Sequence, residues 1–242
     1  MKKQGLFAQM VKSLLLAGAL AVSGCATTDP DFADPRDPFE DFNRTMFSFN
    51  DMLDRALIKP LGEGYNFVVP TPVNRGVTNF FNNIDDVTSA VNNLLQFKMG
   101  RALNDVGRVA VNSTIGIGGL FDVASNLDMP RYNEDFGQTL GTWGVASGPY
   151  IVLPLLGPTS GRDGVGMVAD WYTDPITYID DDGWRYGLRA LDLIDTRADL
   201  INTSRVLDQA ALDPYSFVRD AYLQKRQNDV YDGNPPPPTE TF

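Results

Sequence analysis

The side chains that most often carry out enzyme chemistry are nearly absent from this sequence of 242 residues. It contains no histidine, and its only cysteine is Cys25. Ser–His–Asp and Cys–His catalysis are therefore excluded, a His- or Cys-based metal site has no ligands, and no disulfide can form within the chain. Carboxylates are plentiful, yet no Gly-x-Ser-x-Gly nucleophile elbow accompanies them. These absences disfavour a lipid hydrolase.

The densest acidic run, Asp180-Asp181-Asp182-Gly183, invites a calcium-site interpretation. EF-hand ligands alternate along their loop and end on a distal glutamate, and this run does neither. We expect instead a charged turn that caps the following helix.

Cys25 has a chemical role of a different kind. Residues 1–24 carry three lysines, then an apolar run and small residues, which is the pattern of a secretory signal peptide. The run ends in LAVSGC (20–25), which resembles the lipobox of bacterial lipoproteins. The Cys25 thiol would receive a diacylglyceryl group, and its amine an acyl chain, which together anchor a protein firmly. Because Ala26 follows, rather than aspartate, we expect anchoring in the periplasm-facing inner leaflet of the outer membrane. No other cofactor is expected.

The composition fits one domain behind this anchor. A chain with 43% hydrophobic residues can bury a full core. The excess of 31 acidic over 20 basic residues argues against a nucleic-acid partner, whose phosphates require a basic surface. We predict a lipidated tether at 25–36, a single helical domain at 37–232 and a disordered Pro-rich tail at 233–242.

The first helix of that domain has a clear start. Asp37 is predicted as its N-cap, with Pro38 at the first helical position and Glu40 reaching back as in a capping box. We expect the helix to end before Pro60. Its apolar residues recur at helical spacing and would lie either in the core or partly among lipid tails: Phe39, Phe42, Met46, Phe49, Leu53 and Ala56.

Further helices are predicted along the rest of the chain. One begins at Thr71-Pro72, a separate one follows through Val87, and another spans 101–114. Within the last, Arg108 and Asn112 lie four residues apart, which is typical of a solvated face. Later starts are expected at Ser160, Asp174-Pro175 and Asp213-Pro214. No period-2 strand is evident, so the predicted fold class is all-α.

Two apolar stretches interrupt the helical pattern. Residues 148–158 (GPYIVLPLLGP) carry no charge, and their three prolines forbid a regular helix. This segment must be a buried loop or an apolar backbone that lines a passage at membrane depth. The glycine-rich stretch 115–121 is predicted to be flexible, and the chain between the two stretches could swing as a hairpin.

Several segments together strongly resemble the MlaA (VacJ) family of outer-membrane phospholipid-transport lipoproteins. They cover nearly all of residues 37–222 in the family's order: DPFEDFNRTMFSFN (37–50), PVNRGVTNFFNN (72–83), VNNLLQ (91–96), NSTIGIGGLFDVA (112–124), FGQTLGTWGVASGPYIVLPLLGPTSGRD (136–163) and DPYSFVRDAY (213–222). Val87 and Thr159 depart from the residues that are frequent in the family.

The resemblance implies a compact, ring-like bundle of short amphipathic helices, monotopic in the membrane, with a central polar passage and no enzymatic activity. Such a protein would remove phospholipids misplaced in the outer leaflet and pass them to a soluble periplasmic carrier (MlaC). A trimeric outer-membrane porin would be a further partner.

On this interpretation, the residues of the gate and lipid passage can be named. Phe49 and Asn50 lie where the apolar stripe meets the polar face and are predicted to form part of the gate. Hinges of a moving hairpin are expected at the glycines and prolines of the two apolar stretches, and Asn112 and Tyr150 complete the predicted passage. The hinge residues are Gly116, Gly118, Gly119, Pro149 and Pro154.

Two other functions stay open at this point. A structural lipoprotein could scaffold porins without moving lipid, and a lipid hydrolase could use the carboxylates.

Overall fold

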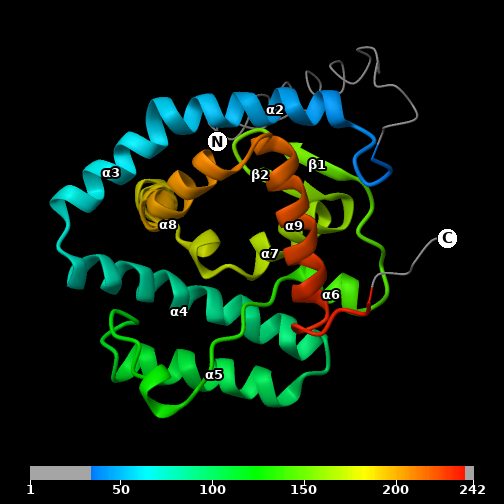
Figure 1. Cartoon of the computed structure of the whole chain (residues 1–242). Coiled ribbons are helices and arrows are strands. Elements are labelled where there is room, and N and C mark those ends of the chain that lie inside the picture. The colour runs from blue at the N-terminus through cyan, green and yellow to red at the C-terminus, as the bar shows by residue number, and fades with distance from the viewer. Residues whose placement is uncertain (1–33, 238–242) are drawn as a thin grey trace, which may run out of the picture.

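The chain folds as a ring of helices (Figure 1). The structure is a computed structural model that describes residues 34–237, with the backbone alone for 206–210; the predicted signal peptide and Cys25 lie outside this range. The elements that follow one another around the ring are in contact: α2 (Glu40–Leu53) with β1 (Tyr150–Leu153), β2 (Gly157–Ser160) with α7 (Gly161–Thr173), α7 with α6 (Phe136–Thr142), α6 with α4 (Thr71–Leu95), α4 with α8 (Asp182–Ala210), and α8 with α3 (Lys59–Val68). Helix α5 packs on the outer side of α4 (Figure 1).

Helices make up most of the described residues, so the all-α expectation is confirmed. Their bounds are α2 (Glu40–Leu53), η2 (Asp54–Ile58), α3 (Lys59–Val68), α4 (Thr71–Leu95), α5 (Met99–Thr114), η3 (Ser125–Leu127), α6 (Phe136–Thr142), α7 (Gly161–Thr173), η4 (Pro175–Tyr178), α8 (Asp182–Ala210) and α9 (Pro214–Val230). Within residues 34–237, no helix combines the length and the apolarity needed to cross a membrane.

The prediction of a regular first helix ending before Pro60 was wrong. The helical ribbon continues through Pro60, with η2 as a π-helical turn between α2 and α3. Proline has no N–H to give to the carbonyl four residues earlier. The Lys59 N–H instead bonds the Asp54 carbonyl five residues back, so one wider turn accommodates Pro60.

The predicted N-cap of this helix was also wrong. Helix α2 begins at Glu40, and its N-cap residue Phe39 makes no side-chain capping bond. Glu40 pairs with Arg44 at 2.7 Å. Asp37 is buried, and its carboxylate accepts hydrogen bonds from Asn43 and Tyr215 instead of from the first N–H groups of the helix.

The two helices predicted around Val87 are one. Helix α4 runs unbroken for 25 residues, because no proline or glycine lies between Val77 and Leu95. Asp86, which could have capped a second helix, is fully buried and paired with Arg108 and Arg131.

The uncharged segment forms a β-hairpin that sequence analysis did not predict. Strand β1 (Tyr150–Leu153) pairs antiparallel with β2 (Gly157–Ser160), with Tyr150 opposite Ser160 and Leu153 opposite Gly157. The residues of β1 are all apolar or aromatic, so their sequence shows no polar–apolar alternation, although their burial alternates in the strand. The hairpin thereby satisfies the backbone groups of this apolar segment.

The remaining helix starts agree with the sequence. Ser160 and Asp213 accept hydrogen bonds from the N–H groups of Asp163 and Tyr215, and Asp174 caps the short helix η4. In the acidic run, Asp181 accepts from the Trp184 N–H at 2.9 Å, so it caps the start of α8 as predicted.

The interior is unusually polar for a helical protein. The apolar core around Tyr150, Val152 and Tyr215 is small. On α4, the buried side chains are almost all polar and recur at helical spacing: Asn83, Asp86, Ser89, Asn92 and Asn93. Helix α4 therefore buries its polar face, whereas a helix of an ordinary soluble bundle buries its apolar face.

Candidate functional site

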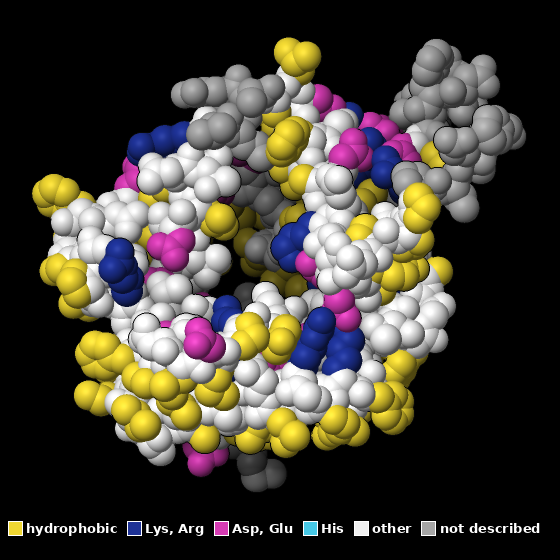
Figure 2. Space-filling model, turned by 60° about the horizontal axis from the view of Figure 1, so that its bottom comes forward, with side chains coloured by type: hydrophobic (Ala, Val, Ile, Leu, Met, Phe, Trp, Pro, Cys, Tyr) yellow, Lys and Arg dark blue, Asp and Glu magenta, His cyan; other side chains and the backbone are white. Residues whose placement is uncertain are grey.

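The molecule is hollowed near its centre, where α2, α8, α4 and α9 surround an opening (Figures 1 and 2). Hydrophobic side chains gather along the lower rim in Figure 2, over α4 and α5. On α5 and its following loop, Leu103, Val106 and Ile115 are 73%, 56% and 66% exposed. The molecule thus combines a hollow centre, a polar helix interface and an apolar outer rim.

Two pockets lie between α2–η2 and α8, which border the hollow. The polar pocket, of about 450 Å³, is lined mostly by charged side chains and hydroxyls. The apolar pocket, of about 390 Å³, is lined mostly by aliphatic side chains: Leu53, Leu57, Ile58, Leu155, Leu156 and Leu193, with Asn50. Asp54 and Arg197 line both, so the two pockets meet at this ion pair.

Sequence analysis missed Asp54 and Arg197. They are 143 residues apart, and the Arg197 guanidinium contacts both Asp54 carboxylate oxygens, at 2.7 Å from Nε and 2.8 Å from Nη2. Pro60 lies close to the π-helical turn that begins at Asp54, but no local feature of the sequence points to Arg197.

Asn50 holds the turn of the β-hairpin at the edge of the apolar pocket. Its amide donates to the Leu153 carbonyl at 2.9 Å and accepts from the Leu155 N–H at 2.8 Å. Leu155 has a left-handed φ of 67°, which costs a residue with a Cβ about 1–2 kcal/mol. Asn50 therefore stabilises a strained turn whose leucines line the pocket. Phe49, its predicted partner in the gate, is 39% exposed.

Asn43 makes the same kind of contact two turns earlier on α2. It is fully buried, donates to the Tyr150 carbonyl at 3.0 Å and accepts from the Val152 N–H at 2.8 Å. The two asparagines lie two helical turns apart, and the carbonyls that they bond lie three residues apart along the hairpin. Both separations are about 10 Å, so each asparagine reaches its own part of the hairpin. Together they fix β1 against α2.

The other predicted hinge residues of the hairpin flank β1. Pro149 precedes it, and its carbonyl accepts from the Gly161 N–H at 3.0 Å. Pro154 begins the turn after it. Tyr150 is fully buried, and its hydroxyl has no hydrogen-bond partner among the described residues. Burial raises the pKa of this hydroxyl.

The glycine stretch ends α5 in a close turn. Gly116 is packed so tightly that a Cβ there would lie 2.2 Å from the Phe121 carbonyl oxygen. Gly118 and Gly119 have left-handed φ values of 68° and 89°. Gly119 lies beside Asn83 of α4, whereas Pro149 and Pro154 flank β1, which contacts α2, so the structure does not bring the two predicted hinge sets together. Their hinge role stays a prediction.

Arg108 and Asn112 do not form the solvated face that their spacing predicted. They are 1% and 2% exposed, because their polar face turns toward α4 and the loop after α5. Arg108 pairs with Asp86 at 2.9 Å and bonds the Met129 carbonyl at 2.6 Å. Asn112 donates to Asp122 and accepts from the Ala124 N–H. Asn112 thus closes the loop that follows α5.

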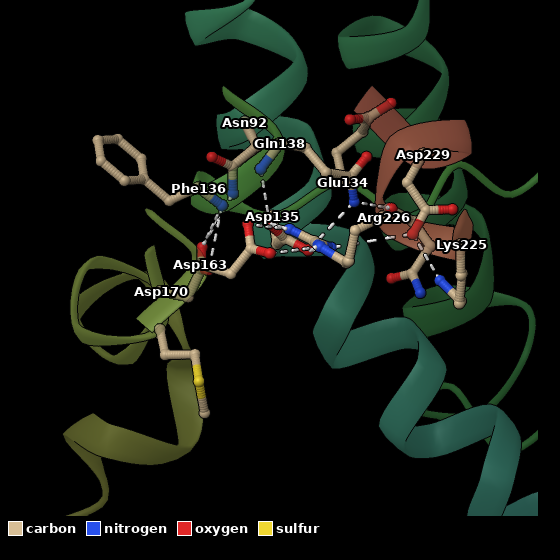
Figure 3. Close-up of polar contacts among 12 residues, drawn as sticks. Asn92, Glu134, Asp135, Phe136, Gln138, Asp163, Asp170, Lys225, Arg226 and Asp229 are labelled. Atoms are coloured by element: carbon tan, nitrogen blue, oxygen red, sulfur yellow. Dashed lines mark hydrogen bonds and ion pairs between the residues drawn. The ribbon is translucent and has the colours of Figure 1, made fainter. Parts of the chain in front are cut away.

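A second polar cluster joins α6, α7 and α9 (Figure 3). Arg226 lies between Asp135 and Asp163 and bonds both carboxylates. Burial opposes ionisation of Asp163, but hydrogen bonds from Arg226 and Tyr222 outweigh it and hold the pKa of Asp163 well below its usual range. Asp170, which accepts from the Phe136 N–H, has its pKa raised to about 6 by burial.

Helices α6 and α7 cross in backbone contact at this cluster. A Cβ on Gly166 would lie 2.4 Å from the Gly137 nitrogen, so only glycine permits the approach. The close crossing brings the first turns of both helices to Arg226. The cluster is thus built to hold the ring together, and its charges are paired internally.

Comparison with known proteins agrees with this architecture. The sequence pattern of the MlaA lipoprotein family matches residues 35–229. Two similar proteins, from Haemophilus influenzae and Escherichia coli K12, are each named intermembrane phospholipid transport system lipoprotein MlaA. The first is 37% identical over 232 residues, covering 90% of this chain and 89% of its own, and the second is 35% identical over 219 residues, covering 88% and 86%.

A solved structure is also similar, from work on the "Structural basis for maintenance of bacterial outer membrane lipid asymmetry". It superposes with a TM-score of 0.71 at 35% identity and covers 82% of this chain and 99% of the solved chain. Because the family pattern, the relatives and the fold agree over most of the length, this chain belongs to the MlaA lipoprotein family.

Proposed function

We propose that this protein is an outer-membrane lipoprotein that transports phospholipids and so maintains the lipid asymmetry of that membrane. Membership of the MlaA family supports this role, as do the names of the relatives. The observation that carries the proposal is the combination of a hollow centre, a polar interior and an apolar outer rim.

The physical reason is the cost of moving a headgroup. Placing a charged group in hydrocarbon costs several kcal/mol or more, roughly 3 even for a single side chain at the centre of a bilayer. A protein with polar groups inside and apolar side chains outside gives the headgroup a polar route while its own surface stays among lipid tails. No chemical change in the lipid is needed, so the proposed activity is not enzymatic.

The finer parts of the proposal concern anchor, place and partners. Acyl chains on Cys25 would hold the chain in the inner leaflet, with the body monotopic in the membrane. Phospholipid misplaced in the outer leaflet would leave through the ring to an MlaC-like periplasmic carrier, and a trimeric porin would hold the protein in place.

The test is the phospholipid content of the cell surface. Cells that lack the protein should expose more phospholipid to an added phospholipase, and the full-length chain should restore the low level. Cys25→Ala should restore it only partly. A scaffold of porins would leave surface phospholipid unchanged when the protein is lost, and a lipid hydrolase would release fatty acid from phospholipid in vitro.

A further inference from the structure

The polar and apolar pockets together have the two-part character of one phospholipid. The polar pocket carries cations and carboxylates in similar number: Arg44, Arg55, Lys59 and Arg197 against Asp51, Asp54 and Asp213. The apolar pocket beside it has the chemistry of an acyl chain's surroundings. Their only shared residues are Asp54 and Arg197, so the ion pair stands where a headgroup would join its tail.

This ion pair can be replaced by a ligand of matching charge. The fork of an arginine bonds a carboxylate and a phosphate in the same two-point geometry. The Arg197 side chain is 14% exposed and that of Asp54 is 30% exposed, so both are accessible from the pockets while largely desolvated. Separating them without compensation would leave two poorly solvated charges, which is costly.

We propose that the Asp54–Arg197 pair is the headgroup-binding site of the transporter and selects zwitterionic phospholipids. The inference rests on the proposed function. The phosphate of the lipid takes the place of Asp54 on Arg197, the released Asp54 carboxylate binds the lipid's ammonium group, and one acyl chain enters the apolar pocket. Both protein charges stay neutralised throughout the exchange.

Two of the three other cations that line the polar pocket are already paired with carboxylates, which leaves little positive charge for an anionic lipid. Arg44 is held by Asp213 at 2.8 Å and by Glu40 at 2.7 Å, and Arg55 contacts Asp51 at 2.9 Å. An anionic headgroup lacks the ammonium group that would bind the released Asp54 carboxylate. The carboxylate would then lie beside the lipid phosphate without a cation between them. Like charges so close repel each other.

The π-helical turn gives the two faces of this site. Asp54 and Arg55 at its start line the polar pocket, while Leu57 and Ile58 at its end line the apolar pocket. Such turns are frequent at functional sites because they redirect side chains that a regular helix would keep on one face.

The experiment measures lipid binding by the full chain purified in detergent. The probes are phosphatidylethanolamine, phosphatidylglycerol and diacylglycerol with identical acyl chains, together with inorganic phosphate. We expect the wild type to bind phosphatidylethanolamine about tenfold more tightly than diacylglycerol and severalfold more tightly than phosphatidylglycerol, in the range of charge-assisted hydrogen bonds.

Variants separate the two halves of the site. Arg197→Gln should reduce binding of both phospholipids to about the level of diacylglycerol, and Arg197→Lys should recover part of it. Asp54→Asn should tighten phosphatidylglycerol binding and abolish the preference for phosphatidylethanolamine. A purely structural ion pair would instead give weaker or unchanged binding of every lipid with Asp54→Asn.

The matched control is Arg205→Gln on the same helix. Arg205 pairs with Glu63 at 3.4 Å and lines neither pocket, so lipid binding should be unchanged. Thermal unfolding of each variant shows that it is folded.

Each result decides a different point. A wild type that binds no phospholipid above detergent would overturn the proposed function itself. Tight phospholipid binding that is indifferent to Asp54 and Arg197, or inorganic phosphate binding as strongly as the lipid, would overturn the headgroup site alone.

Discussion

Side-chain amides do much of the structural work in this protein. Asn43 and Asn50 act on β1 as a neighbouring strand would, by giving its backbone both a donor and an acceptor. A helix has no free backbone groups along its side, so only side chains can bond a strand that lies against it. The asparagines on α2 therefore set the position of the hairpin that borders the apolar pocket.

Asn43→Ala should destabilise the protein by about 2–4 kcal/mol, because it leaves the Val152 N–H and the Tyr150 carbonyl buried without partners. Urea unfolding followed by circular dichroism measures the loss. The control is Thr45→Ala on the same helix, whose exposed hydroxyl bonds only its own helix and should matter by less than about 0.5 kcal/mol. Equal effects of the two substitutions would contradict the assigned role.

Asp105 gives the protein a predictable pH dependence. Burial raises its pKa to about 6, although Asn93 donates a hydrogen bond to it at 2.8 Å. Because the folded pKa is raised, protonated Asp105 contributes stability that is fully present below its ordinary pKa of 3.8 and is lost as the pH rises through about 6.

Asp105→Asn should remove this dependence, since an amide oxygen can accept the same bond without a charge. Relative to the wild type, the variant should gain about 1–2 kcal/mol between about pH 4 and pH 7. Thermal unfolding of both proteins across that range tests this. The pKa of Asp170 is also raised to about 6, but Asp170 is present in both proteins, so its contribution cancels in the difference between their stabilities. If the difference in stability between variant and wild type were the same at every pH, folding would not raise the pKa of Asp105.

At the scale of elements, the turn after α5 combines glycines with different tasks. Gly116 is required by contact, because its Cβ would meet two backbone carbonyls, whereas Gly118 faces open space and is required by its left-handed φ of 68°. The distinction separates a packing role from a conformational one.

Gly116→Ala should therefore cost about 2 kcal/mol or more, from overlap with the Phe121 and Asn112 carbonyls. Gly118→Ala should cost about 1 kcal/mol through backbone strain. Gly100→Ala, in the first turn of α5 with nothing near its Cβ, should be neutral or stabilising by up to about 1 kcal/mol. Chemical denaturation ranks the three variants. If Gly118 is also a hinge, Gly118→Ala should lower lipid removal in cells although the protein is folded; unchanged removal would exclude that role.

At the scale of the whole molecule, the polar faces of α4 and α5 meet each other, and their apolar faces are turned outward. The buried network of Arg108, Asp86 and Arg131 replaces the apolar contact that joins helices in water. Such an arrangement is favourable where the surroundings are apolar, because lipid tails then cover the outer face.

Replacing Leu103 and Val106 together with glutamine should test this orientation. In a Cys25→Ala background, we expect binding to phospholipid vesicles to fall at least about tenfold, because two exposed apolar side chains no longer enter the lipid. Stability should change by less than about 0.5 kcal/mol, since both side chains are exposed. Vesicle flotation gives the binding, and Asn202→Gln, an exposed polar change, is the control. Loss of stability without loss of vesicle binding would show that this face packs on protein.

The sequence by itself determined the helical class, the capped starts at Ser160, Asp174 and Asp213, and the family resemblance, because periodicity and capping are local properties. The tertiary structure alone decided which face of each helix is inside: Arg108 and Asn112 have the spacing of a solvated face and are buried. It also decided that residues 150–160 pair as strands under Asn43 and Asn50, and that Asp54 meets Arg197 between two pockets. An amphipathic pattern gives two faces but does not say which solvent each will meet, and contacts between residues more than a hundred positions apart leave no local signal.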